Sequence, residues 1–83
     1  MYRFIISELH YNNDAIIIAD DNPPEDDNAA GWTEKHKWLI GPYTITEWRS
    51  DRNHLEVEGI VPDGEDPIPA QRMMLEIYAT LPH

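Results

Sequence analysis

The chain has 83 residues, of which 16 are Asp or Glu and only 6 are Lys or Arg, giving a formal net charge of −10. This length fits one small domain, three Trp and four Tyr are enough aromatic residues to build a core, and the absence of Cys excludes a disulfide framework or a thiolate zinc site. The charge disfavours direct binding to nucleic acid or anionic membranes, because both are polyanions.

The acidic residues are concentrated in two segments. Residues 4–34 hold eight acids and residues 53–71 hold five, and neither segment contains a Lys or an Arg. A surface with charge segregated in this way attracts a basic partner. Solubility alone would also explain it, so both interpretations stay open here.

The N-terminal part of the chain predicts a β-hairpin. Residues 2–9 and 15–19 are rich in Ile and aromatic side chains, and residues 11–14 between them contain Asn and Asp, which suit turn positions. The segment 15–19 is apolar on both faces, which favours a strand in the middle of a sheet.

Residues 20–31 predict a long exposed loop. This segment has tandem prolines, five carboxylates and no apolar periodicity. Loops of about a dozen residues in a compact domain are often functional, so this acidic loop is a candidate binding surface, with mobility and no function as the alternative.

Three further strands are predicted over residues 36–40, 43–49 and 54–61, the last two as a hairpin that turns at residues 50–53. Gly41-Pro42 either ends the first of these strands or bends it at a sheet edge, and the sequence does not decide between the two.

The last strand, residues 54–61, alternates apolar and polar side chains. Leu55 and Val57 would face the core, and Glu56 and Glu58 would share the solvent face. Two residues along a strand advance about 6.6–6.8 Å, which is close to two phosphate steps of a nucleic-acid strand at about 3.4 Å each. The pair could therefore imitate a polyanion.

A helix is predicted from Pro67 to about Thr80, with Asp66 as its N-cap and a proline in its first turn. Six residues form its apolar stripe: Ala70, Met73, Met74, Ile77, Tyr78 and Leu81. The predicted order is β-β-loop-β-β-β-α in one domain, residues 1–83. The fold class is α+β, a small, mostly antiparallel sheet of four to five strands with one C-terminal helix packed on a face.

No catalytic or cofactor motif is present, so no enzymatic activity and no cofactor are expected. Ser50, Asp51 and His54 lie close together only because one predicted turn contains them, and they lack a buried third group and an oxyanion site. Aligning the acidic loop with a calcium-binding loop leaves Ala30 and Lys37 at ligand positions. No dedicated metal site is expected.

The cluster Phe4-Ile5-Ile6 is much shorter than the apolar stretch of a signal peptide, and no run approaches the roughly 20 residues that span a bilayer. Together with the absence of Cys, this predicts a soluble, cytoplasmic protein without membrane contact.

The main functional hypothesis is a non-enzymatic protein that occludes a basic surface of a partner protein, including a nucleic-acid-binding surface. In its small size, acidity and lack of Cys the chain resembles phage-encoded inhibitors of host defence, including anti-CRISPR and anti-restriction DNA mimics. This resemblance is one of composition. The residues expected to contact the partner are Asp20, Asp21, Glu25, Asp26, Asp27, Glu56, Glu58, Asp63, Glu65 and Asp66.

The alternative hypothesis belongs to a different class, a homo-oligomeric structural or accessory domain. Its interface would be the apolar helix or the exposed sheet edge, and the acidic residues would serve solubility only. A homodimer is compatible with the sequence. Electrostatic association weakens as salt screens it, whereas an apolar interface does not, so a salt series separates the two hypotheses.

Overall fold

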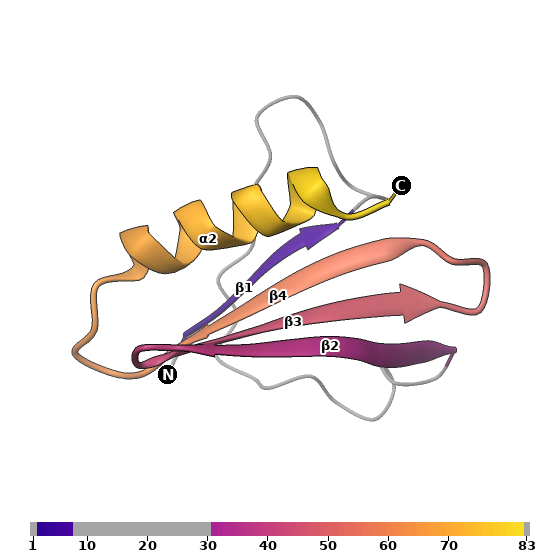
Figure 1. Cartoon of the computed structure of the whole chain (residues 1–83). Helices are drawn as coiled ribbons and strands as arrows, with labels where there is room; N and C mark the ends of the chain where they lie inside the picture. The colour runs from indigo at the N-terminus through magenta and orange to yellow at the C-terminus, as the bar shows by residue number, and fades with distance from the viewer. Residues whose placement is uncertain (1, 8–30, 83) are drawn as a thin grey trace.

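An antiparallel sheet with one helix on its face forms the fold (Figure 1), in a computed structural model that describes residues 2–7 and 31–82. The elements, in chain order, are β1 (Tyr2–Ser7), β2 (Trp32–Ile40), β3 (Tyr43–Ser50), β4 (Leu55–Val61) and α2 (Pro67–Thr80). The strand order in the sheet is β1-β4-β3-β2. The predicted α+β class, the antiparallel sheet and the C-terminal helix are confirmed. The predicted strand at residues 15–19 lies outside the described residues.

Gly41-Pro42 is the turn between β2 and β3, which resolves the choice that the sequence left open. Ile40 pairs with Tyr43, so the connection has two residues. Gly41 has a φ of 56°, and proline fixes the next φ near −65°. This is the combination that a type II′ hairpin turn requires, and its twist matches that of the flanking strands.

The turn between β3 and β4 occupies the predicted position. The Asn53 amide donates to the Ser50 carbonyl over 2.8 Å, and Asn53 takes a φ of 64°, a conformation that Asn tolerates. The Ser50 hydroxyl oxygen accepts the amides of Arg52 and His54 over 3.1 and 2.9 Å. Ser50 thus stabilises a turn whose position, residues 50–53, the sequence predicted.

The pairing of β1 with β4 makes β4 a central strand. Ile6 is opposite Val57, and Tyr2 is opposite Val61, across more than fifty residues of sequence. The predicted pairing of the first strand with residues 15–19 lies outside the described residues, and the sequence contains no local signal for the β1–β4 pairing.

The helix α2 begins as predicted. Asp66 is its N-cap, and the Asp66 Oδ1 atom accepts the Ile68 amide over 3.0 Å. The predicted stripe faces the sheet, since Ala70, Met74 and Tyr78 are buried. The main core cluster consists of Ile6, Ile45, Leu55, Val57, Met74 and Tyr78, with Phe4, Trp38, Met73, Ile77 and Leu81 packed against it.

The helix covers the sheet unevenly. Its backbone lies close to β4, and closer to β1 and β3 than to β2, which it does not approach (Figure 1). The strand β2 therefore projects beyond the helix and is exposed along most of its length. Within residues 2–7 and 31–82, the strand β2 and the loop that leads into α2 both carry a run of exposed residues.

Candidate functional site

Three of the predicted contact residues lie together on the loop between β4 and α2. Asp63, Glu65 and Asp66 are all exposed. The loop lies at the same end of the sheet as the Gly41-Pro42 turn (Figure 1), because β4 runs toward the end at which the β2–β3 hairpin closes. These three carboxylates form the acidic end of the domain.

Tyr43, the first residue of β3, fixes the acidic end to the sheet. Its hydroxyl donates to the Asp66 carbonyl over 2.6 Å. Burial raises the pKa of Tyr43 above its ordinary value of 10.0, and the carboxylates of Glu65 and Asp66 add to the shift. The loop therefore has a defined position relative to the core, and its negative potential acts on a buried side chain.

Glu58 corrects one prediction, because it does not face solvent. Its side chain is buried, and its Oε2 atom accepts the Arg3 Nε–H over 2.6 Å while Oε1 lies 3.4 Å from the Trp48 indole nitrogen. Arg3 reaches Glu58 because β1 lies beside β4. Buried carboxylates need such partners, so Glu58 has an internal role that the alternation pattern did not reveal.

Glu56 lies on the same face as Glu58 and is half-buried. The Ser7 hydroxyl donates to its Oε2 atom over 3.3 Å. The other predicted contact residues are Asp20, Asp21, Glu25, Asp26 and Asp27, which lie outside the described residues. The structure thus brings together three of the ten predicted residues as an exposed group.

The charge of the described part is more balanced than that of the whole chain. Residues 2–7 and 31–82 hold nine acids and six bases, whereas residues 8–30 hold seven acids and no base. Ion pairs within the described part include Arg3–Glu58, Arg49–Glu47 and Lys37–Glu34. Most of the acidic excess therefore belongs to the sequence between β1 and β2.

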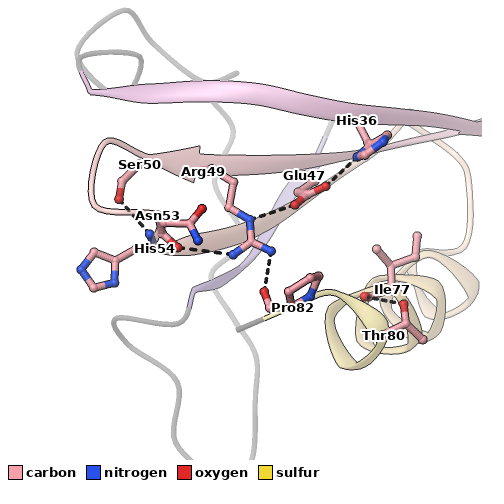
Figure 2. A network of polar contacts seen from close by, with 9 residues as sticks. All are labelled: His36, Glu47, Arg49, Ser50, Asn53, His54, Ile77, Thr80 and Pro82. Atoms are coloured by element: carbon pink, nitrogen blue, oxygen red, sulfur yellow. Dashed lines mark hydrogen bonds and ion pairs between the residues drawn. The ribbon is translucent and has the colours of Figure 1, made fainter.

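A second polar network, which the sequence analysis missed, crosses the sheet on the face that carries the helix. The buried Glu47 carboxylate accepts the Arg49 Nε–H at Oε2 over 2.9 Å, and its Oε1 atom lies 2.8 Å from His36 Nδ1 (Figure 2). Glu47 and Arg49 are two residues apart on β3 and so share a face. The sequence signal for this network was an acid and a base two residues apart in a predicted strand, which places both side chains on one face of the sheet.

Arg49 extends the network to the end of the helix. Its side chain, only 6% exposed, donates to the Asn53 carbonyl over 3.3 Å and to the Pro82 carbonyl over 2.5 Å (Figure 2). One guanidinium thus connects β3, the β3–β4 turn and the segment after α2. His36 is far more exposed, at 67% of its side chain, and its ring stacks on Trp38 at a centroid distance of 5.5 Å.

The charges of this network predict an acid-sensitive stability. Burial acts to raise the pKa of Glu47, but the hydrogen bonds from His36 and Arg49 and their charges outweigh burial and hold it below its ordinary 4.5. A carboxylate whose pKa is lower in the folded state stabilises the fold above pH 4.5, and this stabilisation is lost as the pH falls through the folded-state pKa.

We expect Glu47→Gln to be less stable than the wild type at pH 7 and the difference to narrow below about pH 4.5. Urea unfolding at a series of pH values measures it. The control is Glu76→Gln, which changes an exposed acid of α2 and should leave the pH profile as in the wild type. A Glu47→Gln profile parallel to that of the wild type at every pH would contradict the role assigned to this carboxylate.

Among residues 2–7 and 31–82, no group of three or more His, Asp or Glu side chains is arranged to hold a metal ion. Within the same residues, no helix is long and apolar enough to cross a membrane. No protein-family model matches this chain, and neither a curated protein nor a solved structure shows significant similarity to it.

Proposed function

We propose that this chain is a small, non-enzymatic, cytoplasmic binding protein that occludes a basic surface of a partner protein. The observation that carries the proposal is the acidic end, where Asp63, Glu65 and Asp66 expose three carboxylates within four residues of a loop fixed to the core by Tyr43. A nucleic-acid-binding surface is the kind of partner that such a group of charges fits, because its Lys and Arg residues are arranged to contact phosphates.

The position of the acidic end favours steering of a basic partner. Its carboxylates project from one end of the domain, whereas the exposed Lys35 and Lys37 lie along the β2 edge. Charges separated in this way orient an approaching partner and raise the association rate at low ionic strength. Glu58 is not part of this surface, because its carboxylate is buried against Arg3.

The proposal predicts that the double variant Asp63→Asn/Glu65→Gln loses the partner. Both side chains are exposed, so their neutral isosteres should leave the fold intact, and Asp66 is retained because it caps α2. The tagged wild type and variant are used to capture proteins from host lysate at low and high salt. We expect the wild type to retain a basic protein at low salt, high salt or added DNA to displace it, and the variant to retain several-fold less.

The matched control is Asp51→Asn/Glu76→Gln, which removes the same two negative charges from the β3–β4 turn and the middle of α2. If only the net charge matters, both double variants lose the partner equally. Equal capture by all three proteins, or a partner retained at high salt and without a nucleic-acid site, would contradict the proposal.

The exposed β2 edge favours a second candidate function, a homo-oligomeric domain whose acidic residues serve solubility. Leu39 on this strand is 76% exposed, the largest value among the large hydrophobic residues of the described part. An exposed apolar residue on an edge strand is a feature of sheets that pair with another chain.

A further inference from the structure

The strand β2 is one of the two edge strands of the described sheet, β1 being the other, and within residues 2–7 and 31–82 no strand pairs with the outer edge of β2. It has nine residues, the most of the four strands, and the side chains of Thr33–Lys37 and Leu39 are exposed. The helix does not approach it. The backbone amide and carbonyl groups along this edge are therefore positioned to accept another strand.

A bulge in β2 determines which of its side chains share a face. The register against β3 shifts between Glu34 and His36, so Lys35 is the additional residue. Because of this shift, Glu34 and Lys37 lie on the same face, opposite Trp48 and Thr46. Their side chains lie 3.5 Å apart, Lys37 Nζ to Glu34 Oε1.

Trp32 and Leu39 lie on that same face, away from the helix. They are opposite Ser50 and Thr44, which alternate along β3 with the core residue Ile45. From one end of β2 to the other, this face therefore presents Trp32, Glu34, Lys37 and Leu39. These four residues are placed symmetrically about the midpoint between Lys35 and His36. An apolar residue stands at each end, and an acid and a base stand at the two inner positions.

From this pattern we propose that β2 pairs antiparallel with β2 of a second copy, about a two-fold axis between Lys35 and His36. This register places Glu34 opposite Lys37 of the other copy and Trp32 opposite Leu39, each pair occurring twice. The two four-stranded sheets become one continuous sheet, and the exposed Leu39 is covered by an indole. This dimer rests on the second candidate function, the homo-oligomeric domain, and gives its interface and register. It requires neither the acidic end nor a partner of another kind.

The neighbouring registers are less favourable. An axis through His36 places Lys35 opposite Lys37, and it also opposes Glu34 to Trp38, which lies on the other face. An axis between His36 and Lys37 opposes Glu34 to Leu39 and leaves both charges of the face without an opposite charge. Lysines on an edge strand usually prevent pairing, but here each Lys37 has a carboxylate to meet in the proposed register.

Charge reversal at these two positions tests the dimer. Glu34 and Lys37 have side-chain exposures of 44% and 48%, so Glu34→Lys and Lys37→Glu should both fold. Each single variant opposes like charges twice and should raise the dimer dissociation constant about tenfold or more. The double variant E34K/K37E should return the dissociation constant to the wild-type value. An equal mixture of the two single variants should do the same, because the mixed dimer has opposite charges at both contacts.

Sedimentation equilibrium from about 1 μM to about 1 mM protein measures the constants, and native mass spectrometry with one variant labelled with 15N detects the mixed dimer. The control reversals are Arg72→Glu and Glu76→Lys on the exposed side of α2, which should leave the dimer unchanged. A wild-type chain that is monomeric over the whole range overturns the proposal. A dimer that the mixture does not restore, or that the control reversals weaken equally, also overturns it. The acidic end is unaltered throughout, so this outcome is independent of the captured-partner experiment.

Discussion

Replacing Arg49 with methionine is expected to lower the free energy of unfolding by about 3 kcal/mol. The guanidinium is buried and donates to the Glu47 carboxylate and to the carbonyls of Asn53 and Pro82. Without it, a buried carboxylate loses its principal positive charge and the Pro82 carbonyl loses its hydrogen bond to the sheet. For 83 residues the total stability is roughly 4–12 kcal/mol, so this one change removes a large part of it.

Urea unfolding of a mutant cycle separates the stability lost with the Glu47–Arg49 ion pair from the stability lost through the change in side-chain volume. The double variant Glu47→Leu/Arg49→Met removes both charges, and a buried ion pair replaced by apolar side chains is often neutral in stability. We expect the double variant to be more stable than Arg49→Met alone. Arg52→Met, an exposed change in the adjacent turn, is the control and should stay within about 0.5 kcal/mol of the wild type. Additive losses in the cycle would show that Glu47 and Arg49 act independently.

The elements that were predicted correctly are those whose signals are local. Asp66 and Pro67 mark the start of α2, and the stripe that includes Ala70, Met74 and Tyr78 fixes its buried face. The turn at Ser50 follows from short polar side chains that bond to nearby amides. The exposure of Asp63, Glu65 and Asp66 also follows from local chemistry, because charged side chains in a turn before a helix remain in contact with solvent.

The errors concern contacts between residues far apart in the sequence. Alternation along β4 correctly places Glu56 and Glu58 on one face, but it cannot show that Arg3 lies beside that face. The second polar network, around Glu47 and Arg49, was missed for the same reason. Its members His36, Glu47 and Pro82 come from β2, β3 and the segment after α2. A charge in a strand can be solvated or paired, and only the sheet order decides which.

The close approach of α2 to β4 gives the second large expected effect. Gly59 lies beneath the helix, where a Cβ atom would overlap the sulfur of Met74, a core residue that is 1% exposed. We therefore expect Gly59→Ala to destabilise the fold by about 1–3 kcal/mol, because Met74 must leave its position in a packed core. Met74→Ala should cost about 2–5 kcal/mol through lost burial and the cavity that it leaves.

The two changes should compensate each other in part. In the double variant Gly59→Ala/Met74→Ala, the new methyl group occupies space that the shortened side chain has vacated, so the loss should be smaller than the sum of the single losses by about 1 kcal/mol or more. Urea unfolding of the four proteins measures this coupling. Leu75→Ala on the exposed side of the same helix is the control. Leu75 is 37% exposed, so Leu75→Ala should lower the free energy of unfolding less than Met74→Ala does. Strict additivity would mean that Met74 does not contact Gly59, and that the helix packs against the sheet through other residues.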